Sequence, residues 1–297
     1  MRAFHNVCRH RAAPVLTAPC GRATRLRCRY HGWTYDLTGR LRGTPEFEGV
    51  ANFSREDNGL APLAVEEWGP FVWVCPEAPP CPLAQYLGPL PGRFAALDLD
   101  RLRWAGSRSF EVRCNWKVFV DNYLDGGYHV NTVHPGLAGI LNYSEYRTEV
   151  AGFTSSQISP LRPAEPGGPS EAVAQARGGD RAYYLWVFPN VMFNFYAGYL
   201  DTNVVLPLGP DRCRVDYEFY FEQTEGPEAQ AHIAHSIAVS DQIQMEDSVI
   251  CEEVQRGLGS RSYETGRYSV RREGAVYAFH QLLARHLRVS SAACGFA

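Results

Sequence analysis

Two short segments near the start of the chain decide its fold: Asn6-Val7-Cys8-Arg9-His10-Arg11 and Cys28-Arg29-Tyr30-His31-Gly32-Trp33. Each contains one cysteine and one histidine, and seventeen residues separate His10 from Cys28. A turn lets both side chains of a pair converge on one ion or cluster, and Gly32 gives the backbone freedom for a close approach. The sequence therefore predicts a metal or cluster site with Cys8, His10, Cys28 and His31 as ligands.

A structural zinc site is the alternative, because it also uses two thiolates and two imidazoles. Zinc fingers usually place their histidines together on a helix, whereas each of these loops supplies one cysteine and one histidine. This division favours a two-iron cluster in which each loop offers one ligand type to each iron. Cys20 lies between the loops without a partner motif, and we expect a plain thiol there.

The residues around these loops have the composition of short strands. β-branched and aromatic residues are dense in segments 26–30, 33–35 and 69–74. The proline-rich segment 77–82 follows, and it is typical of a connection between domains. We therefore predict a small all-β domain over residues 1–85 and a second domain over residues 86–297.

The composition excludes several classes of protein. With 297 residues, 45% hydrophobic and 21% charged, the chain is typical of globular proteins, and no stretch reaches the roughly 18 apolar residues of a membrane span. A net charge of −3 gives no overall attraction to nucleic acid or anionic lipid. Nine cysteines without regular spacing argue against a disulfide framework and for a reducing compartment. We expect small-molecule chemistry, with no nucleic acid and no membrane as partner.

The arginine-rich start needs a separate explanation. Seven arginines precede Asp36, the first acidic residue, and this pattern is also typical of an organelle transit peptide. The same stretch contains the cysteine and histidine pattern, so we expect a cytoplasmic protein. An organelle stroma is the alternative if a transit peptide lies upstream.

A second pair of histidines lies in the segment 115–135. His129 and His134 are five residues apart, which turns the second side chain by roughly 140° on an ideal helix. A regular helix would not direct both at one ion, so the helix must end or loosen between them. Pro135 supports this prediction, because the residue before a proline avoids helical conformation.

A distant helix offers the acidic partner. We predict a helix over about 228–255, closed by Gly257, with Asp247 about 35° and Glu246 about 65° from the centre of its apolar stripe. The stripe consists of Ile233, Val239, Ile243, Ile250 and Val254. This geometry mildly favours Asp247. Two histidines and one carboxylate that leave open positions are typical of an iron(II) site that activates dioxygen; the alternative is that Asp247 pairs with a buried arginine or caps a loop.

Other parts of the second domain are predicted more simply. Segments 183–188 and 215–221 have the composition of strands, and the second shows two-residue alternation. The glycine- and proline-rich segment 162–170 is typical of a surface loop. The same region is dense in aromatic residues, for which a strand core is the simplest prediction: Tyr184, Trp186, Phe188, Phe193, Phe195, Tyr196 and Tyr199.

The two cysteine and histidine loops resemble the cluster-binding loops of Rieske non-haem iron oxygenases. The resemblance implies that Cys8 and Cys28 hold one iron of a two-iron, two-sulfur cluster and that His10 and His31 hold the other. Segments 121–130, 244–247 and 251–258 are similar to the branch of these oxygenases that includes choline monooxygenase, and segments 68–71 and 207–210 fit the same branch. By this resemblance His129, His134 and Asp247 are the ligands of a mononuclear Fe(II).

The resemblance also implies a fold and an activity. The fold is α+β: a small all-β Rieske domain, then a helix-grip-like catalytic domain with an antiparallel sheet and a long helix. The enzyme would use O2 and electrons from a ferredoxin or flavin reductase to hydroxylate a quaternary ammonium compound such as choline or a betaine. Such a substrate implies an aromatic cage around its methylated ammonium group, and the seven aromatic residues between Tyr184 and Tyr199 named above are the candidates. Related chains work as rings, so we expect a homotrimer. The alternatives are an aromatic-ring-hydroxylating oxygenase and a truncated, inactive metal-binding homologue.

The chain departs from the family pattern in two places. Family members carry several dozen residues before the first cluster loop, so we expect this chain to be truncated at its N-terminus, and the inactive alternative rests on this expectation. Many relatives have an acid three residues before the first iron histidine, where it bridges cluster and iron of neighbouring subunits, but this position is Gly126. Asp121 and Asp125 are candidates for the bridging role, and Asp125 could equally be a solvated helix residue or a partner of His129. The histidines that match no ligand pattern are His5, His232, His235, His280 and His286.

Overall fold

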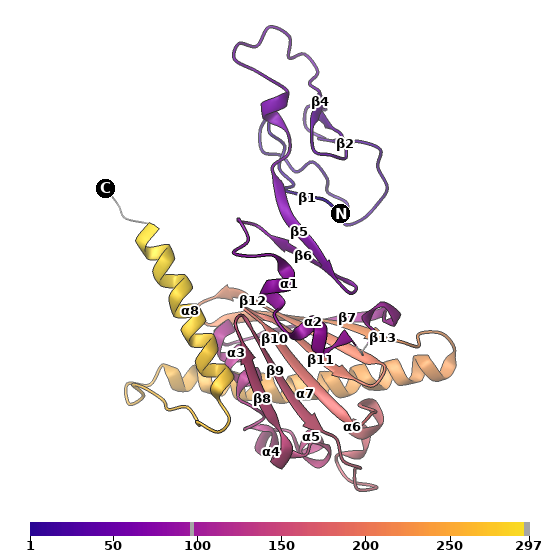
Figure 1. Ribbon diagram of the computed structural model, residues 1–297, viewed down its shortest axis with the longest axis vertical. Coiled ribbons are helices and arrows are strands. Elements are labelled where there is room, and N and C mark those ends of the chain that lie inside the picture. Colours follow the sequence, from indigo (N-terminus) through magenta and orange to yellow (C-terminus); the bar gives the residue numbers. More distant parts are fainter. Residues whose placement is uncertain (96–97, 294–297) are drawn as a thin grey trace. The chain divides into compact units, whose positions relative to one another are not determined.

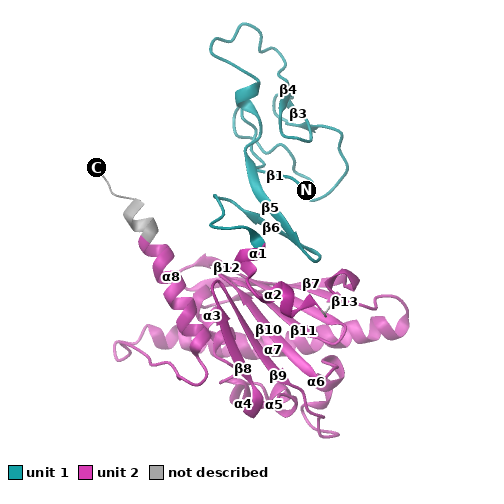
Figure 2. Ribbon diagram, in the orientation of Figure 1, with its two compact units in different colours: residues 1–83 teal, residues 84–297 magenta. Residues whose placement is uncertain are grey.

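The computed structural model describes residues 1–95 and 98–293, which form two compact units. Unit 1 comprises residues 1–83 and unit 2 comprises residues 84–297 (Figure 2). The division falls at the start of helix α1 (Leu83–Leu87), directly after the proline-rich segment. Proline lacks a backbone N–H group, so a segment with several prolines forms few of the hydrogen bonds that join strands.

Unit 1 is built from two small antiparallel sheets. The first contains β1 (Ala3–Phe4), β5 (Pro62–Trp68) and β6 (Phe71–Cys75); the second contains β2 (Leu26–Arg27), β3 (Thr34–Tyr35) and β4 (Leu41–Gly43), with the short helix η1 at Glu56–Asn58. The predicted strand over 26–30 is too long, because the backbone turns at Cys28, whose carbonyl accepts the N–H of Gly32 at 3.1 Å. The predicted strand over 69–74 begins too early, because residues 69–70 form a hairpin turn.

Unit 2 contains one seven-stranded antiparallel sheet in the order β7-β13-β12-β11-β10-β9-β8 (Figure 1). Its strands are β7 (Arg103–Val112), β8 (Arg147–Ala151), β9 (Thr154–Pro160), β10 (Arg181–Val187), β11 (Val191–Tyr196), β12 (Tyr199–Gly209) and β13 (Arg212–Phe221). The predicted alternation is confirmed in β13, where every second residue from Val215 to Phe221 is buried. The predicted surface loop over 162–170 is also confirmed.

Helices pack against this sheet, and the helix α3 contacts β12, β13, α7 and α8. The helices of unit 2 after α1 are α2 (Leu90–Arg93), α3 (Trp116–Leu124), α4 (Val130–Val133), α5 (Pro135–Ile140), α6 (Glu171–Ala176), α7 (Pro227–Leu258) and α8 (Gly274–Ala293), with η3 at Leu99–Arg101 and η4 at Tyr143–Glu145. The predicted α+β class, with a small β domain, an antiparallel sheet and a long helix, is confirmed.

The long helix α7 differs from its prediction in two respects. It continues through Gly257 and ends at Leu258. Its buried face also differs, because Val254 is 44% exposed whereas Ile237 is buried. The middle of that face carries the buried polar residues Ser236, Ser240 and Gln244, so a count of apolar residues locates the face imperfectly.

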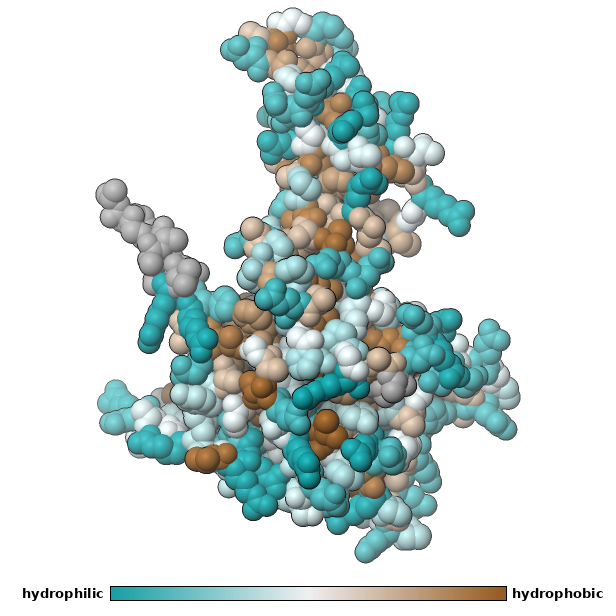
Figure 3. Space-filling view, viewed as in Figure 1, coloured by the Kyte–Doolittle hydropathy of each residue, from teal (hydrophilic) through white to brown (hydrophobic). Residues whose placement is uncertain are grey.

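None of the described helices is both long enough and apolar enough to cross a bilayer. Figure 3 shows hydrophobic residues scattered among hydrophilic ones over this face of unit 2. Apolar residues that are scattered singly in this way are normal for a globular protein.

Candidate metal centres

The two histidines of unit 2 flank the short helix α4, which ends at the second of them. His129 precedes α4, and His134 separates α4 from α5 with φ −115° and ψ 80°. Pro135 begins α5, where its missing N–H costs nothing. The predicted break between the two histidines is therefore confirmed, and it directs both rings to one point.

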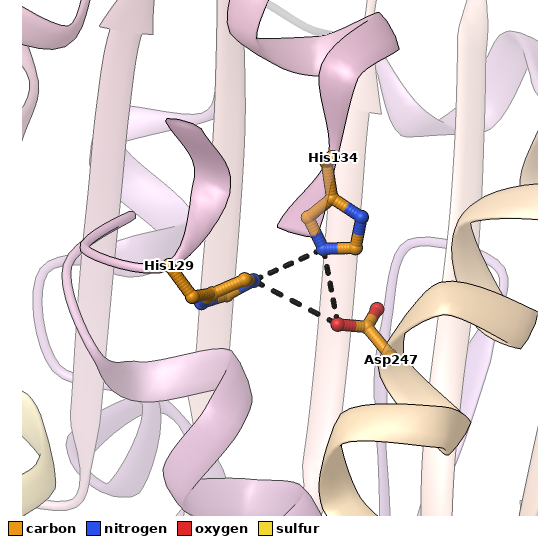
Figure 4. A group of neighbouring side chains, drawn as sticks. All are labelled: His129, His134 and Asp247. Atoms are coloured by element: carbon orange, nitrogen blue, oxygen red, sulfur yellow. Dashed lines mark hydrogen bonds and ion pairs between the residues drawn. The ribbon is translucent and has the colours of Figure 1, made fainter. Parts of the chain in front are cut away.

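Asp247 from α7 meets the two rings at that point (Figure 4). The His134 Nε2 atom lies 3.0 Å from His129 Nε2 and 3.1 Å from Asp247 Oδ1, and the His129 Nε2 atom lies 3.7 Å from the same oxygen. Three ligand atoms within 4.8 Å of one another, on residues far apart in sequence, form a donor set that fits a divalent metal ion.

A carboxylate contacts the Nδ1 atom of each ring, which is the ring nitrogen away from Asp247. Asp125 Oδ2 lies 2.6 Å from His129 Nδ1, and Glu246 Oε2 lies 2.7 Å from His134 Nδ1. These partners place the proton on Nδ1 and leave the lone pair of each Nε2 facing the centre. Of the alternatives for Asp125, the partner of His129 is the one that the structure shows. Of the two acids on α7, Asp247 faces the open nitrogens, while Glu246 lies behind His134.

Further hydrogen bonds fix the carboxylates. Asp125 accepts the backbone N–H groups of Tyr128 and His129, each at 3.0 Å. Asn122 donates to Asp247 Oδ1 at 2.6 Å. Sequence reasoning did not single out Asn122, although it lies one helical turn before Asp125 in the segment that resembles the family.

The electrostatics of the triad favour a cation. Burial lowers the pKa of His134, but the carboxylates of Asp247 and Glu246 outweigh it, so the pKa lies above its ordinary value. The metal-free site thus attracts positive charge, and a divalent ion would replace the proton.

A side chain at Gly126 would be strained and would meet the backbone of another segment. The φ of +70° at this glycine lies in the left-handed region, and a Cβ atom would lie 2.3 Å from the carbonyl oxygen of Arg272. The backbone of the segment before α8 therefore occupies the space of a side chain at position 126. Asp121, the other bridging candidate, pairs instead with His280 on α8 at 2.9 Å. Its carboxylate is thus engaged within unit 2, by a histidine to which the sequence assigned no role.

The two loops of unit 1 bury their cysteines. Cys8 and Cys28 are each 2% exposed and both are free thiols. The Tyr35 hydroxyl lies 3.3 Å from Cys8 Sγ, and burial, followed by this contact, raises the pKa of that tyrosine. A neutral Tyr35 can donate its proton to a thiolate. The rings of His10 and His31 meet edge to face, with centroids 4.6 Å apart.

One atom in unit 1 tests whether a cluster fits. The Nδ1 atom of His10 is buried, and it has no hydrogen-bond partner in the described part of the chain. The ring stacks on Trp33 at 4.8 Å, so it is held in place by an apolar contact. A buried imidazole nitrogen without a partner is costly. A metal ion would satisfy it, and two thiols and two imidazoles are the donor set of a Rieske cluster.

A cavity opens beside the triad in unit 2. His129, His134 and Asp247 line one part of it, and its volume of about 90 Å³ is several times what one water needs. Its aromatic walls are Phe119, Tyr123, Tyr146, Tyr184, Tyr196 and Tyr217.

Most of the expected cage residues lie elsewhere. Of the seven aromatic residues proposed from sequence, Tyr184 and Tyr196 are among those that line this cavity. Phe193 and Phe195 instead pack with Phe94 in a stack on the strands. Trp186 and Phe188 pack near Phe279, and Tyr199 lies under Arg177. For these five the simpler interpretation, a strand core, is correct.

The other cysteines among the described residues lie outside both centres. Cys114 and Cys213 are buried with their sulfurs 3.8 Å apart, and Cys251 is buried nearby. Cys20 is exposed, and Cys294 lies outside the described residues.

The two units correspond to two known families. Residues 1–54 match the Rieske [2Fe-2S] domain, and residues 99–289 match the catalytic domain of the ring-hydroxylating alpha subunit. Together these domains define an iron-dependent redox enzyme with a 2Fe-2S cluster and a mononuclear iron. The chain belongs to the Rieske oxygenases, which use small substrates, O2 and electron transfer.

Similar proteins lie in one branch of that family. The chain is 39% identical to a chloroplastic choline monooxygenase of Arabidopsis thaliana over 97% of its length and 69% of the relative. It is 28% identical to the carnitine monooxygenase oxygenase subunit of Escherichia coli K12, covering 96% of the chain and 77% of the relative. A solved structure of the quaternary ammonium Rieske monooxygenase CntA, described for carnitine oxidation and inter-subunit electron transfer, matches with a TM-score of 0.79, 27% identity and coverage of 96% and 78%. The chain spans 62 to 69% of the length of the plant choline monooxygenases that it matches.

Proposed function

We propose that this chain is a monooxygenase that hydroxylates a quaternary ammonium compound, using O2 and external electrons. The observation that carries the proposal is the convergence of His129, His134 and Asp247 on one wall of an aromatic cavity. One oxygen atom would enter a C–H bond of the substrate and the other would leave as water, so two electrons and two protons must be supplied.

We assign the metal ligands as follows. Cys8, Cys28, His10 and His31 would hold the two-iron cluster. His129, His134 and Asp247 would hold the mononuclear iron, whose open positions supply dioxygen activation when it is bound. The orphaned nitrogen of His10 and the paired Nε2 atoms of unit 2 support these assignments.

The protein's own residues would keep this site ready. Asp125 and Glu246 hold protons on the two Nδ1 atoms, so both histidines present a lone pair toward the centre. Asn122 restrains Asp247 from the side of α3. The three ligands thus need little rearrangement to take up an ion.

The cavity walls suit a methylated ammonium group. Such a group donates no hydrogen bonds, and it is stabilised by aromatic ring faces and nearby carboxylates. The hydroxyl groups of Tyr123, Tyr146 and Tyr217 are already bonded to groups of the protein. Their aromatic bodies therefore remain as the part of each side chain offered to a ligand.

The electron donor would dock on unit 1. The seven arginines that precede Asp36 are all exposed, and His31 is exposed as well. This surface suits an acidic protein, such as a ferredoxin or a flavin reductase. We further propose a homotrimer, in line with the inter-subunit electron transfer described for CntA, and a location in the cytoplasm or an organelle stroma.

Product analysis tests the proposed reaction. The cluster- and iron-loaded chain would be given O2, a ferredoxin with its reductase, and choline, glycine betaine, carnitine or benzoate in turn. We expect oxygen-dependent conversion of a trimethylammonium compound and none of benzoate. Conversion of benzoate alone would favour the ring-hydroxylating alternative.

Metal analysis distinguishes the proposed oxygenase from an inactive metal-binding homologue. We expect three irons per chain and the absorption of a 2Fe-2S cluster. The variant Asp247→Asn should lose one iron and all conversion but keep the cluster absorption, whereas Glu253→Gln, an exposed acid on the same helix, should change neither. Bound zinc, or full iron without conversion of any compound, would contradict the proposal.

A further inference from the structure

A buried arginine borders the same cavity as the proposed iron ligands. Arg177 follows α6 and is 4% exposed. Its Nη2 atom donates to Ser240 Oγ at 2.8 Å. Its Nε and Nη1 atoms are buried and have no hydrogen-bond partner among the described residues. A guanidinium in this position has donor capacity that the protein itself does not use.

The only acid near this group within the described chain is largely used elsewhere. Asp201 lies 3.9 Å from Arg177 Nη1, which is an ion pair without a hydrogen bond. Its oxygens accept hydrogen bonds from Asn194 at 2.6 Å, Asn203 at 3.0 Å and Tyr199 at 2.6 Å. The acid therefore balances the charge of Arg177 but accepts no hydrogen bond from its Nε or Nη1 atom.

Two tyrosines hold the guanidinium in place. Its central carbon lies 4.7 Å from the ring centroid of Tyr196 and 4.9 Å from that of Tyr199. The two rings thus stabilise the cation through their π faces. Tyr199 also bonds to Ser240, at 3.1 Å, so the position of the arginine is fixed from several sides.

The cavity therefore has two electrostatically different ends. Arg177 and Ser240 line it together with His129 and Asp247. Ser240 and Asp247 are seven residues apart on α7, which corresponds to roughly 10 Å along the helix. The end near Asp247 is acidic, because Asp125 and Glu246 lie behind the histidines. The other end contains the Arg177 and Asp201 ion pair, whose guanidinium has two donor atoms without a hydrogen-bond partner among the described residues.

We propose that Arg177 binds the carboxylate of a zwitterionic substrate whose trimethylammonium group lies toward the proposed iron ligands. The inference rests on the proposed function and narrows it from quaternary ammonium compounds in general to betaines. A carboxylate satisfies a buried guanidinium donor through a charge-assisted hydrogen bond. The hydroxyl group of choline is a weaker, neutral acceptor for the same N–H group.

Matched ligands test this subsite without any substitution. Calorimetric titration of the anaerobic, iron-loaded chain would compare three ω-trimethylammonio carboxylates, with one, two or three methylene groups, against their primary amides. At least one acid should bind about tenfold or more tightly than its amide, because only the acid makes a charge-assisted bond. Equal binding of every acid and amide pair would overturn the proposal.

Variants then locate the subsite. Arg177→Met should bring the acid-to-amide ratio close to one and leave amide binding nearly unchanged, and Arg177→Lys should retain part of the preference. Arg181→Met removes an exposed arginine nearby in sequence and should leave the ratio as it is. If Arg177→Met fails to fold, the acid-to-amide ratio of Arg177→Lys and of the unchanged chain tests whether Arg177 binds the carboxylate. An unchanged preference in a folded Arg177→Met variant would also contradict the proposal.

The same titrations distinguish failure of the carboxylate subsite from failure of the proposed function. Binding of amides and choline as tightly as the acids would remove the carboxylate subsite but retain a quaternary ammonium site. Absence of binding by every trimethylammonium compound would instead remove the proposed function, and the subsite with it.

Discussion

The two candidate metal centres differ in how the protein holds their histidine ligands before a metal binds. In unit 2, each histidine has its outer nitrogen bonded to a carboxylate, and the inner nitrogens already lie 3.0 Å apart. In unit 1, the Nδ1 atom of His10 is buried without a partner among the described residues, and strands of only two or three residues flank the loops.

The difference indicates how much each site depends on its metal. The unit 2 site is held by α3, α7 and a seven-stranded sheet, so its core exists before an ion binds. The core beside the unit 1 site contains few residues, and two of them, Cys8 and Cys28, are proposed ligands. Metal binding to such a site is coupled to folding. The cluster is therefore expected to stabilise unit 1 far more than the mononuclear iron stabilises unit 2.

Removal of both metals should give the largest effect. After treatment with a chelator and a reductant, amide hydrogen exchange should become fast throughout residues 1–60 and stay slow in β10 to β13. The physical reason is that unit 1 loses the ligand bonds that replace a large core. Equal protection of both units in the metal-free chain would contradict the comparison.

Substitution of Gly126 probes the rigidity of the unit 2 site. Gly126→Ala should destabilise the chain by about 2 to 5 kcal/mol, because it adds both left-handed strain and a clash with the Arg272 carbonyl. Gly152→Ala is the matched control, since φ is +58° there and a Cβ would meet nothing within 4 Å. Its cost should be only about 1 to 2 kcal/mol. Denaturant unfolding measures both, and equal costs would show that the turn can adjust.

The next largest effect should come from the carboxylates that contact the Nδ1 atoms of the two histidines. Glu246→Gln or Asp125→Asn should weaken iron binding at the mononuclear site about 10- to 100-fold, because each removes the charge that orients a histidine ring. Competition with a coloured chelator measures the affinity. Glu253→Gln should have no effect. Unchanged affinity in the first two variants would mean that the rings are positioned by packing alone.

Tyr35 offers the corresponding test in unit 1. Tyr35→Phe removes the hydroxyl that lies 3.3 Å from Cys8 Sγ. Hydrogen bonds to cluster sulfurs favour the reduced state, so the reduction potential should fall. Redox titration followed by the cluster absorption measures the change. A potential that stays the same would mean that the hydroxyl does not donate to the ligand sulfur.

The smallest expected effect concerns the Asp121 and His280 pair. The hydrogen bond that His280 donates to Asp121 raises the pKa of His280. The pair should therefore stabilise the chain fully below about pH 6.5, as long as Asp121 is ionised, and less as the pH rises through the raised pKa. The thermal midpoint of His280→Ala should therefore lie further below that of the unchanged chain at pH 6 than at pH 8.5. His232→Ala, at an exposed histidine, should show no such trend. A difference that is independent of pH would exclude a charged pair.

Local patterns predicted much of this molecule. Because Pro135 follows His134 directly, the sequence predicted the broken helix that brings the two histidines together. The alternation in β13 and the turn residues around the cluster loops were equally readable, since each depends on near neighbours in the chain. The assignment of His129, His134, Asp247 and the four unit 1 residues to iron stays a prediction, which rests on the family resemblance.

Only the tertiary structure distinguished the roles of similar residues. Asp247 and Glu246 are adjacent, and a helical count barely separates them, but they contact different nitrogens of His134. The strands β10 and β11 contain aromatic residues that look alike in the sequence. In the sheet, however, Tyr184 lines the cavity, whereas Phe193 stacks on Phe195. Arg177 carries no sequence signal, because its unused donors result from what the fold places around it. Residue identity and local spacing determine which chemistry is available, while long-range packing determines which atoms meet.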